Sequence, residues 1–195
     1  MNEQQIIKEF EDAQAILKGH FILSSGLHSD TYLQCARVLM DAQRGARLCK
    51  ALADKVQAQI SEKIDMVVAP AMGGVVVGYE MGRQLGVESI FCERADGSFC
   101  LRRGFDIEDG ANILLVEDVV TTGKSSLETV DCITAYGGKV VAEACLVDRS
   151  AGSVKMPFPL ISLLKIEVAT YEPHKLPTAL AEIPAVKPGS RWLKN

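Results

Sequence analysis

Two adjacent carboxylates and a run of small, hydroxyl-bearing residues stand side by side past the middle of the chain. Glu117 and Asp118 follow the apolar run 113–116, and residues 119–125 read Val-Val-Thr-Thr-Gly-Lys-Ser. The carboxylates can accept hydrogen bonds from sugar hydroxyls or lie near a bound Mg²⁺. The hydroxyls and the backbone N–H groups at the expected start of a helix favour a phosphate. Together the two halves match a ribose 5-phosphate.

Two other interpretations of this stretch are less well supported. The Gly-Lys-Ser at 123–125 is similar to the end of a nucleotide-binding P-loop, but Asp118 stands where that motif requires glycine. A cradle for a nucleoside triphosphate is therefore poorly supported. An ordinary strand-to-helix turn with an incidental acidic pair would account for Glu117 and Asp118, but not for all twelve residues of 114–125.

Strand-turn-helix units must position these residues. Two apolar runs, 66–69 and 113–116, are each followed by a glycine-containing turn and an amphipathic helix. Continuous apolar strands separated by helices are typical of a parallel sheet covered on both faces, with ligands at the carboxyl ends of the strands. We predict an α/β fold. The expected strands are 66–69, 89–92, 113–116 and 140–147.

The segment that precedes this sheet has a different pattern. Apolar residues at helical spacing predict a helix over 6–17, and another over 41–60. Residues 20–32 are polar and broken by glycine, which favours short edge strands. We expect a single domain over 1–195, with a small hood over about 1–40 and a C-terminal tail over 170–195.

Composition limits the class of protein. A chain of 195 residues fits one domain that buries roughly 70% of the surface of its unfolded form. No apolar run approaches the ~20 residues of a membrane span, and a net charge of −4 disfavours a nucleic-acid surface. The six cysteines form no zinc or redox motif, and the N-terminus has no secretion or import signal. We expect no membrane or nucleic-acid partner, and a cytoplasmic location.

The segment 114–125 resembles the motif with which phosphoribosyltransferases bind 5-phosphoribosyl 1-diphosphate (PRPP). That motif has apolar strand residues, two acidic residues, two hydrophobic residues and then Thr-Thr-Gly or Thr-Ala-Gly. The resemblance implies a type I phosphoribosyltransferase fold, in which Glu117 and Asp118 hold the ribose hydroxyls and 121–125 hold the 5′-phosphate. The implied PRPP-binding residues are Arg94, Glu117, Asp118, Val119, Val120, Thr121, Thr122, Gly123, Lys124 and Ser125.

Other segments look like the compact bacterial branch of the orotate phosphoribosyltransferases, in the same order along the chain. They are 19–32, 70–74, 93–105, 147–150 and 188–191. The resemblance implies transfer of ribose 5-phosphate from PRPP to orotate, giving orotidine 5′-monophosphate and pyrophosphate in pyrimidine nucleotide synthesis. It places Thr121 and Arg149 at orotate, whose carboxylate and imide oxygens match a planar guanidinium. A lone arginine after a strand is otherwise commonly solvated.

The stretch 94–105 contains Arg94, Arg102 and Arg103 and has little helical or strand periodicity. Such a charged stretch is usually a solvated loop, but a mobile basic loop could also close over the leaving pyrophosphate and exclude water. The resemblance favours the second role, with these three arginines and Asp118 as catalytic residues. It also implies a homodimer in which the loop reaches the neighbouring subunit's site.

The chain departs from the better-known bacterial relatives in three places. Ser24 stands where they have lysine, the turn at Met72 and Gly73 lacks their lysine, and residues 95–100 contain neither lysine nor histidine. We expect Arg102 or Arg103 to replace the missing loop lysine. Whether the loop acts in cis or in trans, and whether Lys124 touches phosphate, stays open.

The implied cofactor is Mg²⁺, which bridges diphosphate oxygens and ribose hydroxyls and is often held mainly by substrate and water, so no protein ligands are assigned. The three histidines are scattered and receive no acid–base role. Two rival functions remain: a phosphoribosyltransferase for another base, and a non-catalytic PRPP sensor that binds nucleic acid. The hood and Arg149 speak against the first, and the acidic composition without an added domain speaks against the second.

Overall fold

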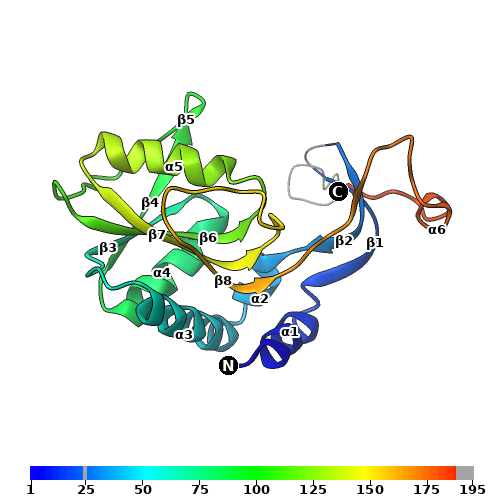
Figure 1. Ribbon diagram of the computed structural model, residues 1–195, viewed down its shortest axis with the longest axis horizontal. Coiled ribbons are helices and arrows are strands. Elements are labelled where there is room, and N and C mark those ends of the chain that lie inside the picture. Colours follow the sequence, from blue (N-terminus) through cyan, green and yellow to red (C-terminus); the bar gives the residue numbers. More distant parts are fainter. Residues whose placement is uncertain (24–25, 188–195) are drawn as a thin grey trace.

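The structure, a computed structural model, describes residues 1–23 and 26–187 and has a sheet-centred body with a smaller extension beside it (Figure 1). The helices are α1 (Glu3–Asp12), α2 (Cys35–Leu39), α3 (Ala42–Gln59), α4 (Gly73–Leu85), α5 (Lys124–Ala135) and α6 (Thr178–Ala181). The strands are β1 (Ile16–Ile22), β2 (His28–Leu33), β3 (Met66–Pro70), β4 (Glu88–Ala95), β5 (Ser98–Cys100), β6 (Asn112–Val120), β7 (Lys139–Asp148), β8 (Leu160–Lys165) and β9 (Thr170–Tyr171).

The body contains a six-stranded sheet in the order β5-β4-β3-β6-β7-β8. All neighbouring strands are parallel except β4 and β5, which form an antiparallel pair. Helices α3 and α4 cover one face, and α5 covers the other (Figure 1). The predicted α/β fold is confirmed, and each of the four expected strands lies within an observed one.

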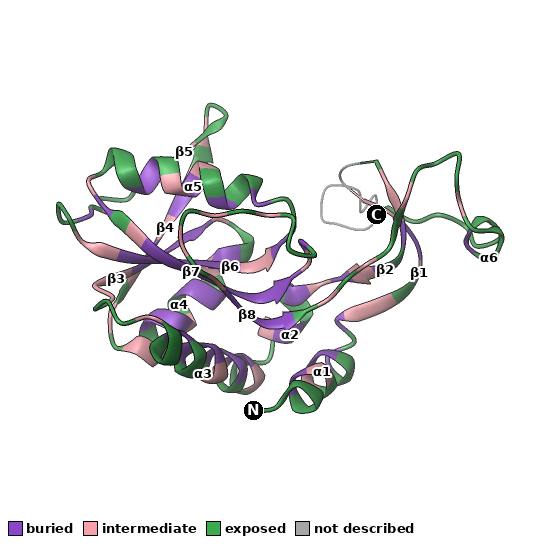
Figure 2. Cartoon of the chain, in the orientation of Figure 1, coloured by how far each residue is buried: buried purple, intermediate pink, exposed green. Residues whose placement is uncertain are grey.

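Alternating residues of the central strands face two separate cores. On β6, Leu114 and Val116 belong to the cluster under α3 and α4, whereas Ile113 and Leu115 belong to the cluster under α5. This two-sided burial explains the continuous apolar runs of the sequence. Figure 2 shows the burial concentrated in these central strands, while the outer faces of the helices are exposed.

Helix α4 lies unusually close to the sheet because glycines line its inner face. Gly74, Gly78 and Gly82 are one turn apart, and all three are buried. A Cβ atom on Gly78 would lie 2.7 Å from the Cβ of Ala69, and one on Gly82 would lie 2.7 Å from the Cβ of Ser89. Only glycine permits this distance, which fixes where the N-terminus of α4 lies relative to β3.

The extension consists of a small antiparallel sheet in the order β1-β2-β9. The strands predicted within 20–32 are therefore confirmed, but the helix predicted over 6–17 is wrong beyond Asp12. Gln14 adopts a left-handed conformation, with φ of 50°, and β1 begins at Ile16. The apolar pairing of β1 with β2 takes precedence over the helical spacing there.

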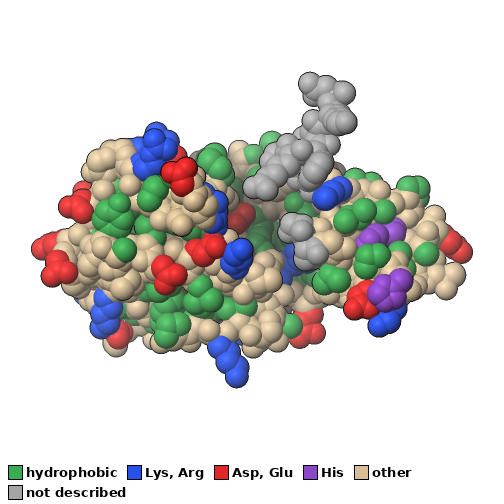
Figure 3. Space-filling model, turned by 90° about the horizontal axis from the view of Figure 1, so that it is seen from above, with side chains coloured by type: hydrophobic (Ala, Val, Ile, Leu, Met, Phe, Trp, Pro, Cys, Tyr) green, Lys and Arg blue, Asp and Glu red, His purple; other side chains and the backbone are tan. Residues whose placement is uncertain are grey.

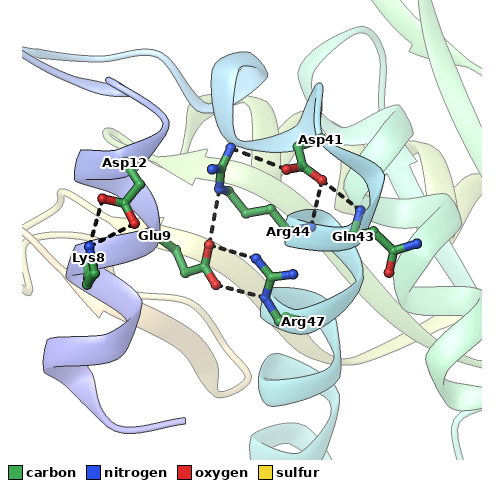
Figure 4. A network of polar contacts seen from close by, with 7 residues as sticks. All are labelled: Lys8, Glu9, Asp12, Asp41, Gln43, Arg44 and Arg47. Atoms are coloured by element: carbon green, nitrogen blue, oxygen red, sulfur yellow. Dashed lines mark hydrogen bonds and ion pairs between the residues drawn. The ribbon is translucent and has the colours of Figure 1, made fainter.

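An ion-pair network attaches α1 to the body (Figure 4). Glu9 of α1 accepts hydrogen bonds from Nε of Arg44 at 3.1 Å and from Nε of Arg47 at 2.8 Å, both on α3. Asp41 caps the same helix by accepting from the backbone N–H groups of Gln43 and Arg44. Because Glu9 is mostly buried and shared by two arginines, this link holds α1 more firmly than an exposed pair such as Lys8 and Asp12 would.

Candidate active site

The acidic pair lies at the carboxyl end of the central strand β6. The strand continues to Val120, so Glu117 and Asp118 lie within it, not after it as the sequence indicated. Glu117 is 8% exposed, and Asp118 is half-buried. A Cβ atom on Gly73 would lie only 2.7 Å from Oδ1 of Asp118, so the turn between β3 and α4 touches this carboxylate.

The turn that contacts Asp118 has a special backbone. The peptide bond between Ala71 and Met72 is cis, and the N–H of Ala71 donates to the carbonyl of Cys92 on the adjacent β4. Gly73 begins α4. The turn 70–74 is distant in the sequence from the segment 117–125, which contains the end of β6 and the residues after it. The two segments thus meet at one edge of the sheet.

The segment after β6 contains the residues that the sequence predicts to hold a phosphate. Thr121, Thr122 and Ser125 are exposed, and α5 begins at Lys124 directly after Gly123, whose φ is 72°. Gly123, the N-cap residue, provides no side-chain cap, and the N–H of Lys124 donates a long hydrogen bond to Oγ1 of Thr122 at 3.4 Å. The next N–H groups of the first turn face the position where the sequence predicts an anion.

Gly123 is also enclosed from the other side. A Cβ atom at this position would lie 2.7 Å from Cγ1 of Val154 and 2.9 Å from Cε of Met156. The connection between β7 and β8 thus packs on the phosphate loop, which we define as residues 121–125. The position of Gly123 is therefore restricted by the side chains of Val154 and Met156.

Arg149 joins the body to the extension. Its backbone N–H donates to the carbonyl of Val120 at 2.8 Å, and its Nε is buried without a partner among the residues described. Burial raises the pKa of Tyr32 on β2, and the nearby Arg149 opposes this while Asp118 adds to it. Tyr32 therefore lies near both groups, which makes it a further candidate site residue that no sequence motif indicates.

A recess separates the body from the extension in the space-filling view of Figure 3, with acidic and hydrophobic side chains on its walls. Beside the acidic pair, a cleft is lined by Asp118 together with Gln34, Met40, Met72 and Val76. The cleft brings together α2, the turn before α4 and the acidic pair.

The electrostatics of the acidic pair favour a cationic or hydrogen-bonding ligand. Burial, with further contributions from Asp118 and from Glu143 on β7, raises the pKa of Glu117 to about 9. Burial also raises the pKa of Asp118. Neither carboxyl forms an ion pair within the described residues, so a bound cation or hydrogen-bond donor would favour the ionised form of each. Residues 1–23 and 26–187 contain no group of three or more metal-binding side chains.

The same burial predicts a pH dependence of stability. The folded protein holds protons on Glu117 up to about pH 9 and on Glu143 up to about pH 7, whereas both have an ordinary value of 4.5 when unfolded. The stabilisation that these protonated carboxyls contribute is complete below pH 4.5. It is lost as the pH rises toward the folded-state pKa values of about 7 and about 9. For Glu143 alone it amounts to about 3 kcal/mol at most.

We therefore expect the free energy of unfolding of the free protein to fall between pH 5 and pH 9, as urea titrations would measure. Glu143→Gln should reduce that slope, because glutamine does not titrate. Glu11→Gln, at an exposed position of α1, should leave it unchanged. A wild-type slope that Glu143→Gln fails to reduce would contradict this attribution.

The basic stretch 94–105 is more regular than predicted. Residues 94–95 extend β4, and β5 pairs with it, so that Arg94 lies opposite Phe99 in a hairpin. The prediction of little strand character is wrong here. The signal was present in Asp96 and Gly97, which have φ values of 49° and 88° and form a dipeptide typical of tight hairpin turns.

The arginines of this stretch point to their own hairpin and helix, not to the acidic pair. Arg94 forms an ion pair with Glu128 of α5, donates to the carbonyl of Gly97 at 2.6 Å and lies over the ring of Phe99. Arg103 pairs with Glu93 at 2.7 Å, whereas Arg102 is exposed. A role for them at the site requires these ion pairs to open.

Two sequence-based assignments have a limited structural context. Lys124 is exposed, and its Nζ lies 3.9 Å from Glu128, one turn farther along α5. Ser24 and the segment 188–191 lie outside the described residues. None of the described helices is long and apolar enough to cross a membrane.

Comparison with known proteins gives consistent matches. Residues 38–179 match the phosphoribosyl transferase domain family. The chain is 54% identical over 191 residues to the orotate phosphoribosyltransferase of Rhizorhabdus wittichii, covering 98% of this chain and 97% of the relative. It is 56% identical over 192 residues to that of Sphingopyxis alaskensis, covering 98% of each.

Solved structures show the same architecture. Orotate phosphoribosyltransferase from Aeropyrum pernix matches with a TM-score of 0.68 and 25% identity, over 82% of this chain and 93% of that one. Adenine phosphoribosyltransferase from Thermoanaerobacter pseudethanolicus matches with a TM-score of 0.57 and 19% identity, over 70% and 88% of the two chains. At that identity the second match concerns the fold alone.

Proposed function

Because the chain belongs to the phosphoribosyltransferase family, and within it to the orotate phosphoribosyltransferases, we propose how its site residues perform that reaction. The enzyme transfers ribose 5-phosphate from PRPP to orotate, forming orotidine 5′-monophosphate and pyrophosphate in pyrimidine nucleotide synthesis. The observation that carries our assignment is the meeting of Asp118, Gly73 and the uncapped start of α5 at one sheet edge.

At this edge the phosphate loop binds the 5′-phosphate, and Glu117 and Asp118 accept hydrogen bonds from the ribose hydroxyls. The 70–74 turn faces the diphosphate, because it lies against Asp118 on the side away from α5. As pyrophosphate leaves, C1 of the ribose becomes positively charged, and the acidic pair stabilises that charge. The orotate nitrogen attacks already deprotonated, so positioning supplies much of the rate without a side-chain base.

Mg²⁺ is the proposed cofactor. The buried acidic pair has no basic partner in the described chain, which fits a substrate that arrives with a cation. Substrate oxygens and water would hold the ion, and Glu117 and Asp118 would bind the ribose hydroxyls. When bound, Mg²⁺ neutralises charge on the leaving diphosphate.

Orotate is assigned to Arg149 and Thr121, at the junction of body and extension. The unpartnered Nε of Arg149 supports this role, because a buried guanidinium nitrogen needs an acceptor. Arg149→Lys should raise KM for orotate roughly 10-fold to 100-fold, since lysine keeps the charge but loses the bidentate fork. KM for PRPP should change less than about 2-fold.

Initial rates with each substrate varied in turn would measure this difference. Arg83→Lys, at an exposed position of α4, is the matched control and should leave both constants unchanged. An equal rise of both constants would contradict a specific role of Arg149 at orotate.

The reaction itself is tested by mixing the protein with PRPP, Mg²⁺ and orotate and following the loss of orotate absorbance. Turnover with adenine, guanine or uracil but not with orotate would overturn the choice of base. PRPP binding without turnover of any base would favour the rival function of a PRPP sensor.

We further propose a homodimer in the cytoplasm. Large hydrophobic side chains are exposed beside the site at Met40, Met72, Val76 and Tyr79, with exposed fractions from 52% to 83%. Such a patch is typical of an interface with a second copy. All six cysteines are free thiols, which favours a reducing compartment. The 94–105 hairpin of one subunit then supplies Arg94, Arg102 and Arg103 to the pyrophosphate of the other.

Mixed dimers test the supply of the hairpin in trans. One parent carries Glu117→Gln with Asp118→Asn, the other carries Arg102→Ala with Arg103→Ala, and each alone should be nearly inactive. After subunit exchange, half of the dimers contain one complete site, so activity should recover to about a quarter of the wild-type value. No recovery, with mixed dimers verified by mass spectrometry, would contradict action in trans.

A further inference from the structure

Glu143 is a fully buried carboxyl in the interior of the enzyme, beneath the phosphate loop. It lies on β7 in register with Leu115 of β6, and Leu115 belongs to the core under α5. Glu143 therefore faces α5 among apolar residues. Charged residue types are rarely buried so completely without a specific partner.

The partner of Glu143 is Ser126, in the first turn of α5. The Ser126 hydroxyl donates a hydrogen bond to Oε1 of Glu143 at 2.6 Å, and the serine is 2% exposed. The second oxygen, Oε2, is buried without a partner among the residues described. Ser126 follows directly on the phosphate loop.

Glu143 also interacts with the other end of the PRPP site. It contributes to the raised pKa of Glu117, which lies two residues beyond Leu115 on the same face of β6. Asp148 on its own strand acts on Glu143 in the same way. Glu143 thus binds the first turn of α5 through Ser126 and also acts electrostatically on Glu117, at the other end of the 117–125 segment.

We propose that Glu143 is a positioning residue for PRPP, which acts through Ser126 by holding the first turn of α5 against the sheet. This inference rests on the proposed role of the phosphate loop. Gly123 has no side chain with which to cap the helix, and Thr122 accepts only a long hydrogen bond, 3.4 Å, from the N–H of Lys124 at the surface. The shorter, buried hydrogen bond of Ser126 ties the same turn to the sheet, so the N–H groups at the start of α5 keep their direction toward the phosphate.

Three variants separate this role from simple packing. Glu143→Met keeps the length of the side chain but removes the acceptor, Ser126→Ala removes the donor, and Glu143→Gln keeps an oxygen acceptor for Ser126. We expect Glu143→Met and Ser126→Ala each to raise KM and the dissociation constant for PRPP about 5-fold to 10-fold, the loss of one hydrogen bond. KM for orotate should stay within about 2-fold, and Glu143→Gln should retain PRPP affinity within about 2-fold.

The double variant Ser126→Ala with Glu143→Met provides the decisive comparison. Because both changes remove the same contact, PRPP affinity should fall no further than in either single variant. Multiplied effects, equal rises of both KM values, or a lower melting temperature with unchanged PRPP affinity would each overturn the proposal. If Glu143→Met does not fold, Ser126→Ala must still weaken PRPP binding selectively.

Asp118→Asn is the reference that distinguishes the two levels of inference. If it abolishes PRPP binding while Ser126→Ala and Glu143→Met bind normally, only the role of Glu143 fails. If all of them bind PRPP normally, the proposed PRPP site itself is misplaced.

Discussion

Replacing Glu117 by glutamine and Asp118 by asparagine together is expected to abolish PRPP binding and turnover in parallel. Each carboxylate is proposed to accept a hydrogen bond from a ribose hydroxyl, and a hydrogen bond to a charged group contributes about 1.5–3 kcal/mol. Two of them correspond to a fall in kcat/KM of roughly 10²-fold to 10⁴-fold. Stabilisation of charge at C1 would be lost as well, which places the expected effect at the upper end.

The melting temperature shows whether the double variant loses activity because it unfolds or because it no longer binds PRPP. Burial raises the pKa of both carboxyls, so the neutral replacements remove a charged form that folding disfavours. The melting temperature of the free double variant at pH 8 should therefore equal or exceed that of the wild type. Calorimetric PRPP titration measures binding, and Asp54→Asn, at an exposed position of α3, is the control. Full activity in the double variant would remove the basis of the proposed site.

Gly73→Ala is expected to reduce kcat/KM by roughly 10-fold to 100-fold, because an added Cβ atom would lie 2.7 Å from Oδ1 of Asp118. Real contacts of this kind are longer, so the carboxylate or the turn must shift. The backbone at Gly73 is helical and does not require glycine. The substitution should therefore displace Asp118 or the 70–74 turn without lowering the stability of α4.

Steady-state kinetics and thermal unfolding of Gly73→Ala check this separation. Gly45→Ala on α3 is the matched control, because a Cβ atom there meets only the side chain of Leu39, at 3.7 Å. That variant should keep full activity and gain up to about 1 kcal/mol from helix propensity. Normal kinetics in Gly73→Ala would mean that Asp118 adjusts without functional loss.

The central fold followed from the sequence because its signal is local. The strands around Val67 and Leu114 are apolar on both faces, and only a sheet covered on both sides buries such strands. The first helix was predicted too long, because the apolar spacing continues through Leu17 while the chain turns at Gln14. Whether β1 or a longer helix buries these residues depends on β2, which lies farther along the chain.

Some features of the candidate site could likewise be predicted from the sequence, and others could not. Glu117, Asp118 and Gly123 are neighbours in sequence, so their combined chemistry was recognisable. The contact of Gly73 with Asp118 and the hydrogen bond of Ser126 with Glu143 join segments that are distant in sequence, and no spacing rule predicts them. The arginine hairpin is intermediate, since its Asp-Gly turn was visible but its pairing with Glu128 was not.

Because Gly74, Gly78 and Gly82 line its inner face, α4 tolerates amino-acid substitutions differently on its inner and outer sides. On the inner side, any side chain at Gly78 would displace the whole helix, and with it the turn that touches Asp118. On the outer side, Tyr79 is exposed and bears no such constraint, whereas the exposed Val76 also lines the cleft at Asp118. Mutation can therefore remodel the outer surface of α4, which the proposed dimer would use, while the inner glycines keep the helix at its distance from the sheet. If subunit association uses this surface, it can be altered independently of the contact between Gly73 and Asp118.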